Sequence, residues 1–306
     1  MRIAVMGAGG IGGYFGGRLA QGGADVAFIA RGAHLGALQK KGLRIKSSLG
    51  DLHLARVVAT DDPAALGRVD LILVGVKLWD TEAAARAIAP LVSGGAAVLS
   101  FQNGVGKDDV LRKVLGDRAV LGGVSYIAAT IEEPGVIAHA GTMQRLVFGE
   151  YGGRRSARAE AFLEACQAGK IDADLSDDIQ RAIWEKFVFL VGLSGTTTTM
   201  RSPIGPIRSN PRSRAFLLDV MREVVAVGRA NGVALASDYA ENRLAFCDTL
   251  PDTMTSSMQV DMERNNRLEL PWLSGGVVDL GAKKGMATPL NRAVVDILAL
   301  YTDGRP

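Results

Sequence analysis

The sequence of 306 residues predicts an α/β N-terminal domain built on a doubly wound parallel sheet, followed by an all-helical C-terminal domain. Two observations predict this division. Short apolar runs alternate with helical stretches as far as about residue 175, which is typical of a parallel sheet covered by helices on both faces. From Ser176 onward the strand-like runs disappear, and prolines punctuate long helical stretches. We therefore expect domains at residues 1–175 and 176–306.

The first domain opens with a strand, a glycine-rich turn, a helix and a second strand. Apolar residues 3–6 run into Gly7-Ala-Gly-Gly-Ile-Gly12, a helix is expected over 11–21, and a second apolar run covers 26–29. In this setting Gly-x-Gly-x-x-Gly is the dinucleotide-binding fingerprint of a Rossmann-type domain. Gly7 allows the tight turn, Gly9 lets a pyrophosphate approach the backbone, and Gly12 lets the helix pack on the strand. The predicted phosphate-binding residues, at a helix N-terminus, are Gly7, Ala8, Gly9, Gly10, Ile11 and Gly12.

The end of the second strand predicts which dinucleotide binds. A site for NAD expects a carboxylate there for the ribose 2′-hydroxyl, whereas a site for NADP offers a cation to the 2′-phosphate. Here the strand ends in Ala30-Arg31-Gly32, with no carboxylate nearby in the sequence. Because a guanidinium can fork onto a phosphate, the sequence predicts NADP(H). The alternative interpretation of Arg31 is an ordinary solvated arginine.

The remaining segments continue these two patterns. In the first domain we expect helices over 33–41, 81–91, 108–115 and 156–168, and strands over 43–46, 52–58, 70–76, 96–100, 120–124 and 173–175. Alternating residues 125–130, 136–139 and 145–148 around Glu132-Glu133-Pro134-Gly135 indicate a hairpin or an antiparallel edge. Ser176 is the predicted cap of a helix that runs to about Leu193 and enters a polar threonine run. Further helices are expected over 212–231, 238–249, 273–284 and 290–301.

Composition excludes several classes of protein. With 48% hydrophobic and 22% charged residues the chain is a globular protein rather than a disordered one, and a net charge of +3 makes nucleic acid an unexpected partner. Two cysteines and three scattered histidines make neither a disulfide framework nor a metal site. No apolar run reaches the roughly 18 residues of a membrane helix, and the chain starts directly with a core strand. We therefore expect a cytoplasmic enzyme without membrane or metal.

Candidate site residues follow the buried strands. In an open α/β sheet, ligands bind beyond the carboxyl ends of the strands, where Lys77 and Asn103 stand. Lys77 can donate to a ribose, a phosphate or the substrate, and Asn103 to a nicotinamide ribose or a carbonyl. A solvated lysine and a turn-forming Asn-Gly pair are the alternatives.

The helical domain offers Lys186, inside the largely apolar segment 182–191. Lys186 shares one helical stripe with Leu190 and Ser194, at i, i+4 and i+8. A lysine in an apolar cleft has its pKa lowered by desolvation, which suits a general acid near neutral pH. The alternative is a lysine that reaches the surface beside Glu185.

Taken together, these residues resemble the ketopantoate reductase (2-dehydropantoate 2-reductase) family over nearly the whole chain. The matching residues, spread over both predicted domains, are Gly7–Gly12, Arg31, Val76-Lys77-Leu-Trp79, Gln102-Asn103-Gly104, Trp184-Glu-Lys186, Ser256-Ser-Met258 with Asp261, and Glu269. The resemblance implies a C-terminal domain like that of 6-phosphogluconate dehydrogenase. It also implies NADPH-dependent reduction of a 2-keto acid, ketopantoate to pantoate in pantothenate biosynthesis, with Lys186 as the catalytic lysine.

The resemblance also implies roles for further residues. Ser257 would help to bind substrate, together with Asn103, Leu190 and Ser194. Glu269 would lie close to the cofactor, Lys186 and the substrate, and could keep Lys186 oriented and protonated; without the resemblance it is an ordinary surface glutamate. The nicotinamide is expected near Asn103 and Ala129.

The sequence departs from the family where the substrate would bind. Leu190, Ser194 and Ile204 stand at positions where the family has asparagines, and losing those donors removes discrimination for a polar substrate. One alternative is therefore a related NADP-dependent 2-keto acid or carbonyl reductase with another substrate. Others are a non-catalytic NADPH-binding sensor and a dehydrogenase that works mainly in the oxidative direction. An apolar helical domain of this kind often supports dimers, so a homodimer is a candidate assembly.

Overall fold

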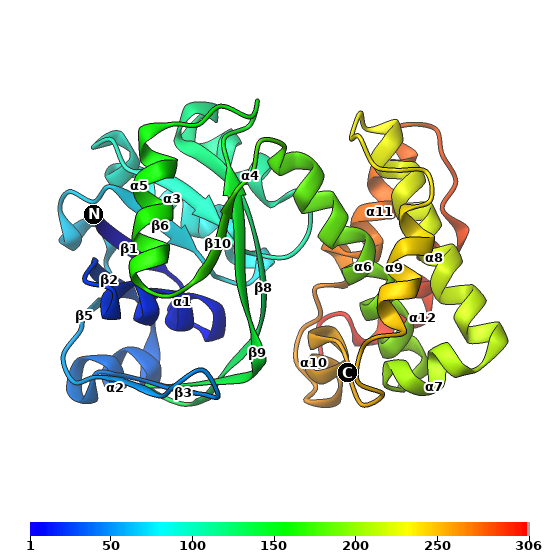
Figure 1. Ribbon diagram of the computed structural model, residues 1–306, viewed down its shortest axis with the longest axis horizontal. Helices are drawn as coiled ribbons and strands as arrows, with labels where there is room; N and C mark the ends of the chain where they lie inside the picture. Colours follow the sequence, from blue (N-terminus) through cyan, green and yellow to red (C-terminus); the bar gives the residue numbers. More distant parts are fainter. Residues whose placement is uncertain (305–306) are drawn as a thin grey trace. The chain divides into compact units, whose positions relative to one another are not determined.

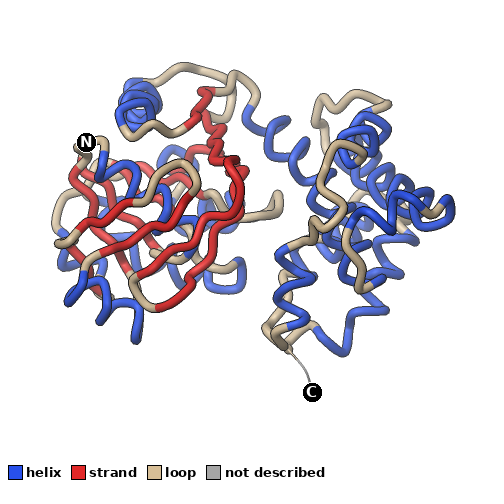
Figure 2. Tube along the Cα trace, turned by 60° about the horizontal axis from the view of Figure 1, so that its bottom comes forward, coloured by secondary structure: helices blue, strands red, loops and turns tan. Residues whose placement is uncertain are grey.

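The computed structural model describes residues 1–304 and divides into two compact units (Figure 1). The first comprises residues 1–102 and 107–179, and the second comprises 103–106 with Gln180 and the residues after it. In the described part of the chain the strands all belong to the first unit, and the second is helical (Figure 2). The predicted fold class is confirmed. The domain limits of 1–175 and 176–306 stay a prediction. The compact units differ from them in that the short loop 103–106 groups with the helical unit.

The first unit is organised around a parallel sheet. Its strands, in spatial order, are β5 (Val58–Thr60), β2 (Asp25–Ile29), β1 (Arg2–Met6), β6 (Leu71–Val74), β7 (Ala97–Ser100) and β8 (Val120–Glu133). Each neighbouring pair in this series is parallel. This is the doubly wound order whose direction of winding reverses between β1 and β6, and ligands of such sheets bind outside that point.

Helices cover both faces because the strand side chains alternate. In β1, Ile3 and Val5 pack into the core that includes α1 (Gly10–Gln21), α2 (Gly32–Lys41) and α5 (Ala157–Ala168). Ala4 packs into the opposite core, with α3 (Thr81–Ser93) and α4 (Lys107–Leu115). These five helices confirm the helical segments expected in this part of the chain, with ends that differ by one or two residues.

The expected hairpin is present, but it lies inside the sheet rather than at an edge. The segments expected as separate strands 120–124 and 125–130 form the single strand β8, which pairs antiparallel with β9 (Val136–Gly149). On its other side β9 pairs in parallel with β3 (Leu43–Ser47) and β10 (Asp172–Leu175). β3 is also paired with β4 (Leu52–Leu54), so the sheet has ten strands in all.

The helical unit surrounds one apolar core. Its helices are α6 (Ile179–Met200), α7 (Ile204–Ser209), α8 (Pro211–Ala230), α9 (Tyr239–Cys247), α10 (Ser257–Glu263), α11 (Ser274–Ala282) and α12 (Pro289–Leu298). Among residues 1–304, the short 3₁₀ segments are η1 (Pro63–Leu66), η2 (Leu78–Asp80), η3 (Asp117–Ala119), η4 (Leu270–Trp272) and η5 (Ala299–Tyr301). Trp184, Phe187 and Val191 of α6 lie in this core beside Met221 of α8. Gly192 lets the two helices approach, because a Cβ there would lie 2.5 Å from Met221 Cγ.

None of the helices within residues 1–304 combines the length and apolar character needed to span a membrane.

The predicted ends of α6 were wrong at both termini. The helix begins at Ile179, and Ser176 Oγ instead accepts a hydrogen bond from the Asp178 N–H at 3.1 Å. It continues through the threonine run to Met200, and the Thr196 and Thr197 hydroxyls are satisfied within the helix by donating to carbonyls one turn earlier, at 2.8 and 2.7 Å. α7 and α10 were not expected, since six and seven residues are too short for a helical period to stand out.

Candidate functional site

The glycine turn lies at the carboxyl end of β1, against the loop after β6. Gly7 has φ +96°, and a Cβ there would lie 2.8 Å from the Val76 backbone nitrogen, so only glycine fits. A Cβ on Gly12 would overlap the Gly7 carbonyl oxygen, so α1 packs directly on the turn. At Gly9, by contrast, an added Cβ would meet nothing within 4 Å. The glycine of this turn that has open space beside it, Gly9, therefore stands at the position expected to face a pyrophosphate.

The N-terminus of α1 fits a phosphate group. Gly9 is the N-cap and supplies no side-chain acceptor to the N–H groups of the first turn. These N–H groups and the helix dipole favour an anion. Ala8 is buried and Ile11 is half-buried. A Cβ on Gly10 would collide with the carbonyl oxygen of Ala129 in β8, so Ala129 lies against the first turn of α1, next to the predicted cofactor site.

Arg31 is exposed at the N-terminus of α2, and it has a carboxylate beside it. Its guanidinium lies 3.3 Å from Asp80 Oδ2, at the end of η2. No carboxylate is near Arg31 in the sequence, but the fold brings the Asp80 carboxylate beside it. The signal that could have found Asp80 is its place after β6, because the carboxyl ends of parallel strands meet at one edge of a sheet.

Lys77 follows β6 at the same edge of the first unit. It is exposed, and its Nζ lies 5.6 Å from the ring centroid of Trp79. The buried Gln102 side chain fixes this loop, because its Nε2 donates to the Val76 carbonyl and to Thr81 Oγ1, both at 2.8 Å. Its Oε1 accepts from Ser100 Oγ at 2.9 Å. Gln102 matched the family pattern, but the sequence did not indicate this positioning.

Lys186, Asn103 and Glu269 are joined by hydrogen bonds within the helical unit. Lys186 Nζ donates to Asn103 Oδ1 at 3.0 Å, and Asn103 Nδ2 donates to Glu269 Oε2 at 3.3 Å. The lysine has only donors to offer and a carboxylate only acceptors, so the two contacts fix which way the Asn103 amide points. The structure thus brings together three residues that lie far apart in the sequence.

The local fold explains how this group is held. One side of α6 is buried through Trp184, Phe187 and Val188, which leaves Lys186 half-buried on another side. Asn103 precedes Gly104, whose φ of +79° lets the loop turn, and Val105 packs against the core of the helical unit. Glu269 stands just before η4 and is 8% exposed. A half-buried ammonium that is fixed by an amide can donate a proton to a bound carbonyl oxygen.

The residues predicted to bind substrate have differing environments. Leu190 and Ser194 follow Lys186 along one stripe of α6, and α6 is helical over all three positions. Leu190 is half-buried, whereas Ser194 is fully buried and its Oγ has no hydrogen-bond partner within residues 1–304. Ile204 is buried in the core of the helical unit. Ser257 is exposed at the start of α10, while the neighbouring Ser256 caps that helix and bonds Thr197 Oγ1 at 2.8 Å.

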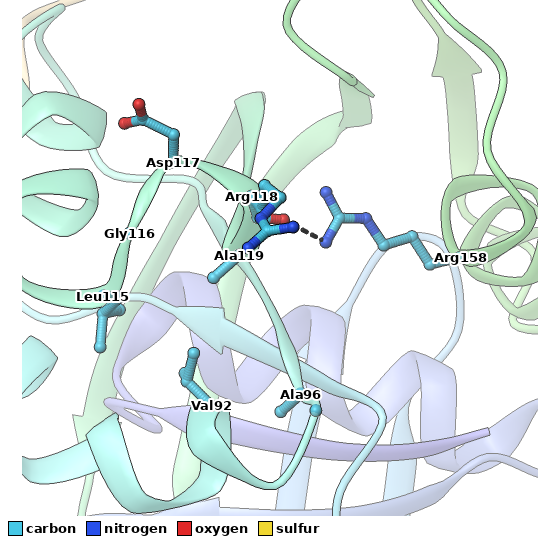
Figure 3. A pocket seen from close by; sticks show the side chains of 9 residues that line it. Val92, Ala96, Leu115, Gly116, Asp117, Arg118, Ala119 and Arg158 are labelled. Atoms are coloured by element: carbon cyan, nitrogen blue, oxygen red, sulfur yellow. Dashed lines mark hydrogen bonds between the residues drawn. The ribbon is translucent and has the colours of Figure 1, made fainter.

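The first unit also has a hollow of about 610 Å³, which lies away from the glycine turn (Figure 3). Two of its lining residues, Ala96 and Ala119, immediately precede β7 and β8, at the amino ends of these strands. Arg158 at its rim is already bound to Glu150 at 2.7 Å and to the Arg118 carbonyl at 2.8 Å. Ligands of open α/β sheets bind at the opposite edge, so this hollow is not the candidate site.

Comparisons with known proteins identify the family. The family model described as ketopantoate reductase PanE/ApbA matches residues 3–153, and the model of the C-terminal domain of that family matches 178–302. The 2-dehydropantoate 2-reductase of Archaeoglobus fulgidus is 33% identical over 97% of this chain and 96% of its own. The enzyme of that name from Halobacterium salinarum is 32% identical over 98% of both chains.

A solved structure extends the similarity to the whole fold. The crystal structure of 2-dehydropantoate 2-reductase from Geobacter metallireducens matches with a TM-score of 0.91 at 32% identity, over 99% of this chain and 100% of that one. The two family models together, and each of these relatives, cover both units. The chain therefore belongs to the ketopantoate reductase family, whose members are dinucleotide-binding oxidoreductases that act on a CH–OH group.

Proposed function

We propose that this protein catalyses the NADPH-dependent reduction of a 2-keto acid to a 2-hydroxy acid, with 2-dehydropantoate (ketopantoate) as substrate and pantoate as product. The observation that carries the proposal is the hydrogen-bonded series Lys186–Asn103–Glu269. It offers a cation and a proton donor, which a reductase of this kind needs. The names of the relatives from Archaeoglobus fulgidus and Halobacterium salinarum support ketopantoate as the substrate.

The glycine turn and Arg31 support NADPH as the cofactor. The open face at Gly9 and the uncapped N-terminus of α1 suit the pyrophosphate, and the exposed Arg31 guanidinium suits a 2′-phosphate. Lys77 and Ala129 border the same sheet edge and would contact the remaining parts of the dinucleotide. The bound reduced nicotinamide supplies the hydride.

Lys186 is the proposed proton donor. As negative charge develops on the carbonyl oxygen of the keto acid, the ammonium group stabilises it and then transfers a proton to the alkoxide. Asn103 restricts the rotation of the long lysine side chain, because its amide oxygen accepts one of the ammonium protons. Glu269 holds the other side of that amide and contributes a negative charge that favours the protonated lysine.

The experiment that tests this function is a rate measurement with a panel of substrates. Oxidation of NADPH and of NADH is followed by nicotinamide fluorescence with ketopantoate, pyruvate and bulkier apolar 2-keto acids. The proposal predicts the highest kcat/KM for ketopantoate with NADPH. A higher value for another keto acid would keep the reductase mechanism and replace ketopantoate as the substrate. No turnover with any of them would contradict a reductase.

A further inference from the structure

His34 joins the glycine turn to the β8–β9 hairpin of the same unit. It lies in the first turn of α2, three residues after Arg31, and is half-buried. One ring nitrogen, Nε2, lies 2.8 Å from the Ala8 carbonyl oxygen. The other, Nδ1, accepts a hydrogen bond of 3.1 Å from the backbone N–H of Gly135. The ring therefore contacts one backbone group on each side.

These two partners determine the protonation state of the ring. A backbone N–H can only donate, so Nδ1 of His34 must carry a lone pair. A carbonyl oxygen can only accept, so Nε2 must carry the hydrogen. The neutral Nε2–H tautomer satisfies both partners. Burial acts in the same direction, because it lowers the pKa of His34 below its usual value, although the bond to Ala8 opposes this.

The Ala8 carbonyl belongs to the peptide group that carries the Gly9 N–H. In a planar trans peptide the C=O and the following N–H point in opposite directions. A donor that fixes the Ala8 carbonyl on the α2 side therefore directs the Gly9 N–H to the other side. The Ala8 N–H is held as well, at 3.1 Å from the Ile29 carbonyl. That N–H belongs to the preceding peptide group, so β2 holds the Gly7–Ala8 peptide and His34 holds the Ala8–Gly9 peptide.

We propose that neutral His34 is a positioning residue for dinucleotide binding, which orients the Ala8–Gly9 peptide so that the Gly9 N–H serves the pyrophosphate at the α1 N-terminus. This inference rests on the proposed function. It also links the two phosphate sites, because Arg31 and His34 stand on the same first turn of α2. A shift of that turn would therefore move the residue for the 2′-phosphate and the donor to Ala8 together.

Acid should weaken this arrangement. Protonation places a second N–H at Nδ1, opposite the Gly135 N–H, so one hydrogen bond becomes a contact between two donors. Charged residues lie on each element around the ring: Arg31 on α2, Glu132 and Glu133 on β8, and Arg44 and Lys46 on β3. Lys46 is paired with Glu132 at 2.7 Å, and the Arg44 N–H bonds the Gly135 carbonyl at 2.9 Å. Other titratable groups of these elements are Tyr14 and Arg18 on α1, Lys40 and Lys41 on α2, and His139 and Arg145 on β9.

The test compares three variants by direct titration with NADPH in the absence of substrate. His34→Ala removes both bonds, His34→Gln keeps an acceptor and a donor on a neutral side chain, and His53→Ala is the control. His53 is exposed on β4 and its ring is 3.4 Å from the Lys41 carbonyl. We expect His34→Ala to raise the Kd for NADPH about tenfold. This factor corresponds to the free-energy cost of leaving one buried polar group without a hydrogen bond. His34→Gln and His53→Ala should stay within about twofold of the wild-type Kd.

Three further measurements separate positioning from general stability. As the pH falls below the ordinary titration range of histidine, the Kd of the wild type should rise more steeply than that of His34→Gln, because only the titration of the 2′-phosphate affects the glutamine variant. With substrate, His34→Ala should raise KM for NADPH and leave kcat within about twofold. The ¹⁵N shifts of the unliganded protein should report the Nε2–H tautomer of His34 at neutral pH.

The outcomes distinguish this inference from the proposed function. If the wild type binds NADPH and His34→Ala binds it equally well, the role of His34 is disproved and the proposed function stands. An imidazolium or Nδ1–H form of His34 at neutral pH also disproves it, even if the alanine variant does not fold. If the wild type binds no dinucleotide, both the proposed function and the inference fail.

Discussion

The Arg31 guanidinium lies 3.3 Å from the Asp80 carboxylate, and the two residues are 49 positions apart in the chain. Arg31 follows β2 and Asp80 follows β6, so the carboxyl edge of the sheet brings them together. The cation proposed to bind the 2′-phosphate therefore has a competing anion beside it. A carboxylate at such an edge can also accept the ribose 2′-hydroxyl of NADH. Preference between the two dinucleotides should depend on both residues.

Replacing Asp80 with Asn should strengthen the preference for NADPH. Removing the carboxylate frees the guanidinium and removes repulsion of the 2′-phosphate; for an exposed pair this is worth about 1 kcal/mol, or roughly fivefold in the ratio of KM values. Arg31→Ala should change the ratio in the opposite direction by raising KM for NADPH alone. Glu82→Gln, which breaks an exposed ion pair with Arg86, is the control. Equal effects on NADH and NADPH would contradict a role in selecting the dinucleotide.

Asn103→Ala should lower kcat without unfolding the protein. The substitution removes the hydrogen bonds that the Asn103 amide makes with Lys186 and with Glu269, so the lysine loses a contact that positions it. We expect a fall of about 10- to 100-fold in kcat, less than the loss of a general acid. Glu269→Gln keeps the shape but removes the charge, and should shift the basic limb of the kcat–pH profile to lower pH. Unchanged kcat in Asn103→Ala would show that the amide does not position the lysine.

The ion pair of Glu150 and Arg158 should make the first unit sensitive to acid. Burial alone would raise the pKa of Glu150, but hydrogen bonds from Arg158 and Ser156, at 2.7 Å each, lower it below its usual value. A carboxyl whose pKa is lower in the folded state stabilises that state above the ordinary glutamate pKa. This stability is lost as the pH falls through the lowered value.

Glu150→Gln should therefore reduce the free energy of unfolding at neutral pH by about 2–3 kcal/mol, the range for hydrogen bonds to a charged group. In the acid range the difference from the wild type should shrink, because both proteins then have an uncharged group at residue 150. Chemical denaturation at a series of pH values measures this. Glu160→Gln, at an exposed pair with Arg155, is the control. A constant difference at every pH would contradict the assigned cause.

Local patterns predicted the elements that are determined locally. The glycine spacing from Gly7 to Gly12 follows from contacts between neighbouring residues, and the buried strands β6 and β7 follow from continuous apolar runs. The threonine run was wrongly expected to lie beyond α6, because threonine is a weak helix former on its own. Its hydroxyls bond carbonyls one turn earlier, and Thr196, Thr197 and Thr198 are buried.

What the sequence could not predict depends on distant contacts. β3 and β9 pair in parallel although their residues are about ninety positions apart, as for Ser47 and His139, and neither strand identifies its partner. The contacts of Asp80 with Arg31 and of His34 with Ala8 have the same origin. The set Lys186, Asn103 and Glu269 came from the family pattern, and its hydrogen bonds became visible only in the fold.

The most direct test of the central claim is the kcat of Lys186→Ala with ketopantoate, measured beside the Kd for NADPH. We expect kcat to fall about a thousandfold, because the general acid is lost, and the Kd to stay within about twofold of the wild type. Lys284→Ala, an exposed lysine of the same helical unit, should leave both values unchanged. A Lys186→Ala variant that turns over at the wild-type rate would contradict the assignment of Lys186 as the proton donor.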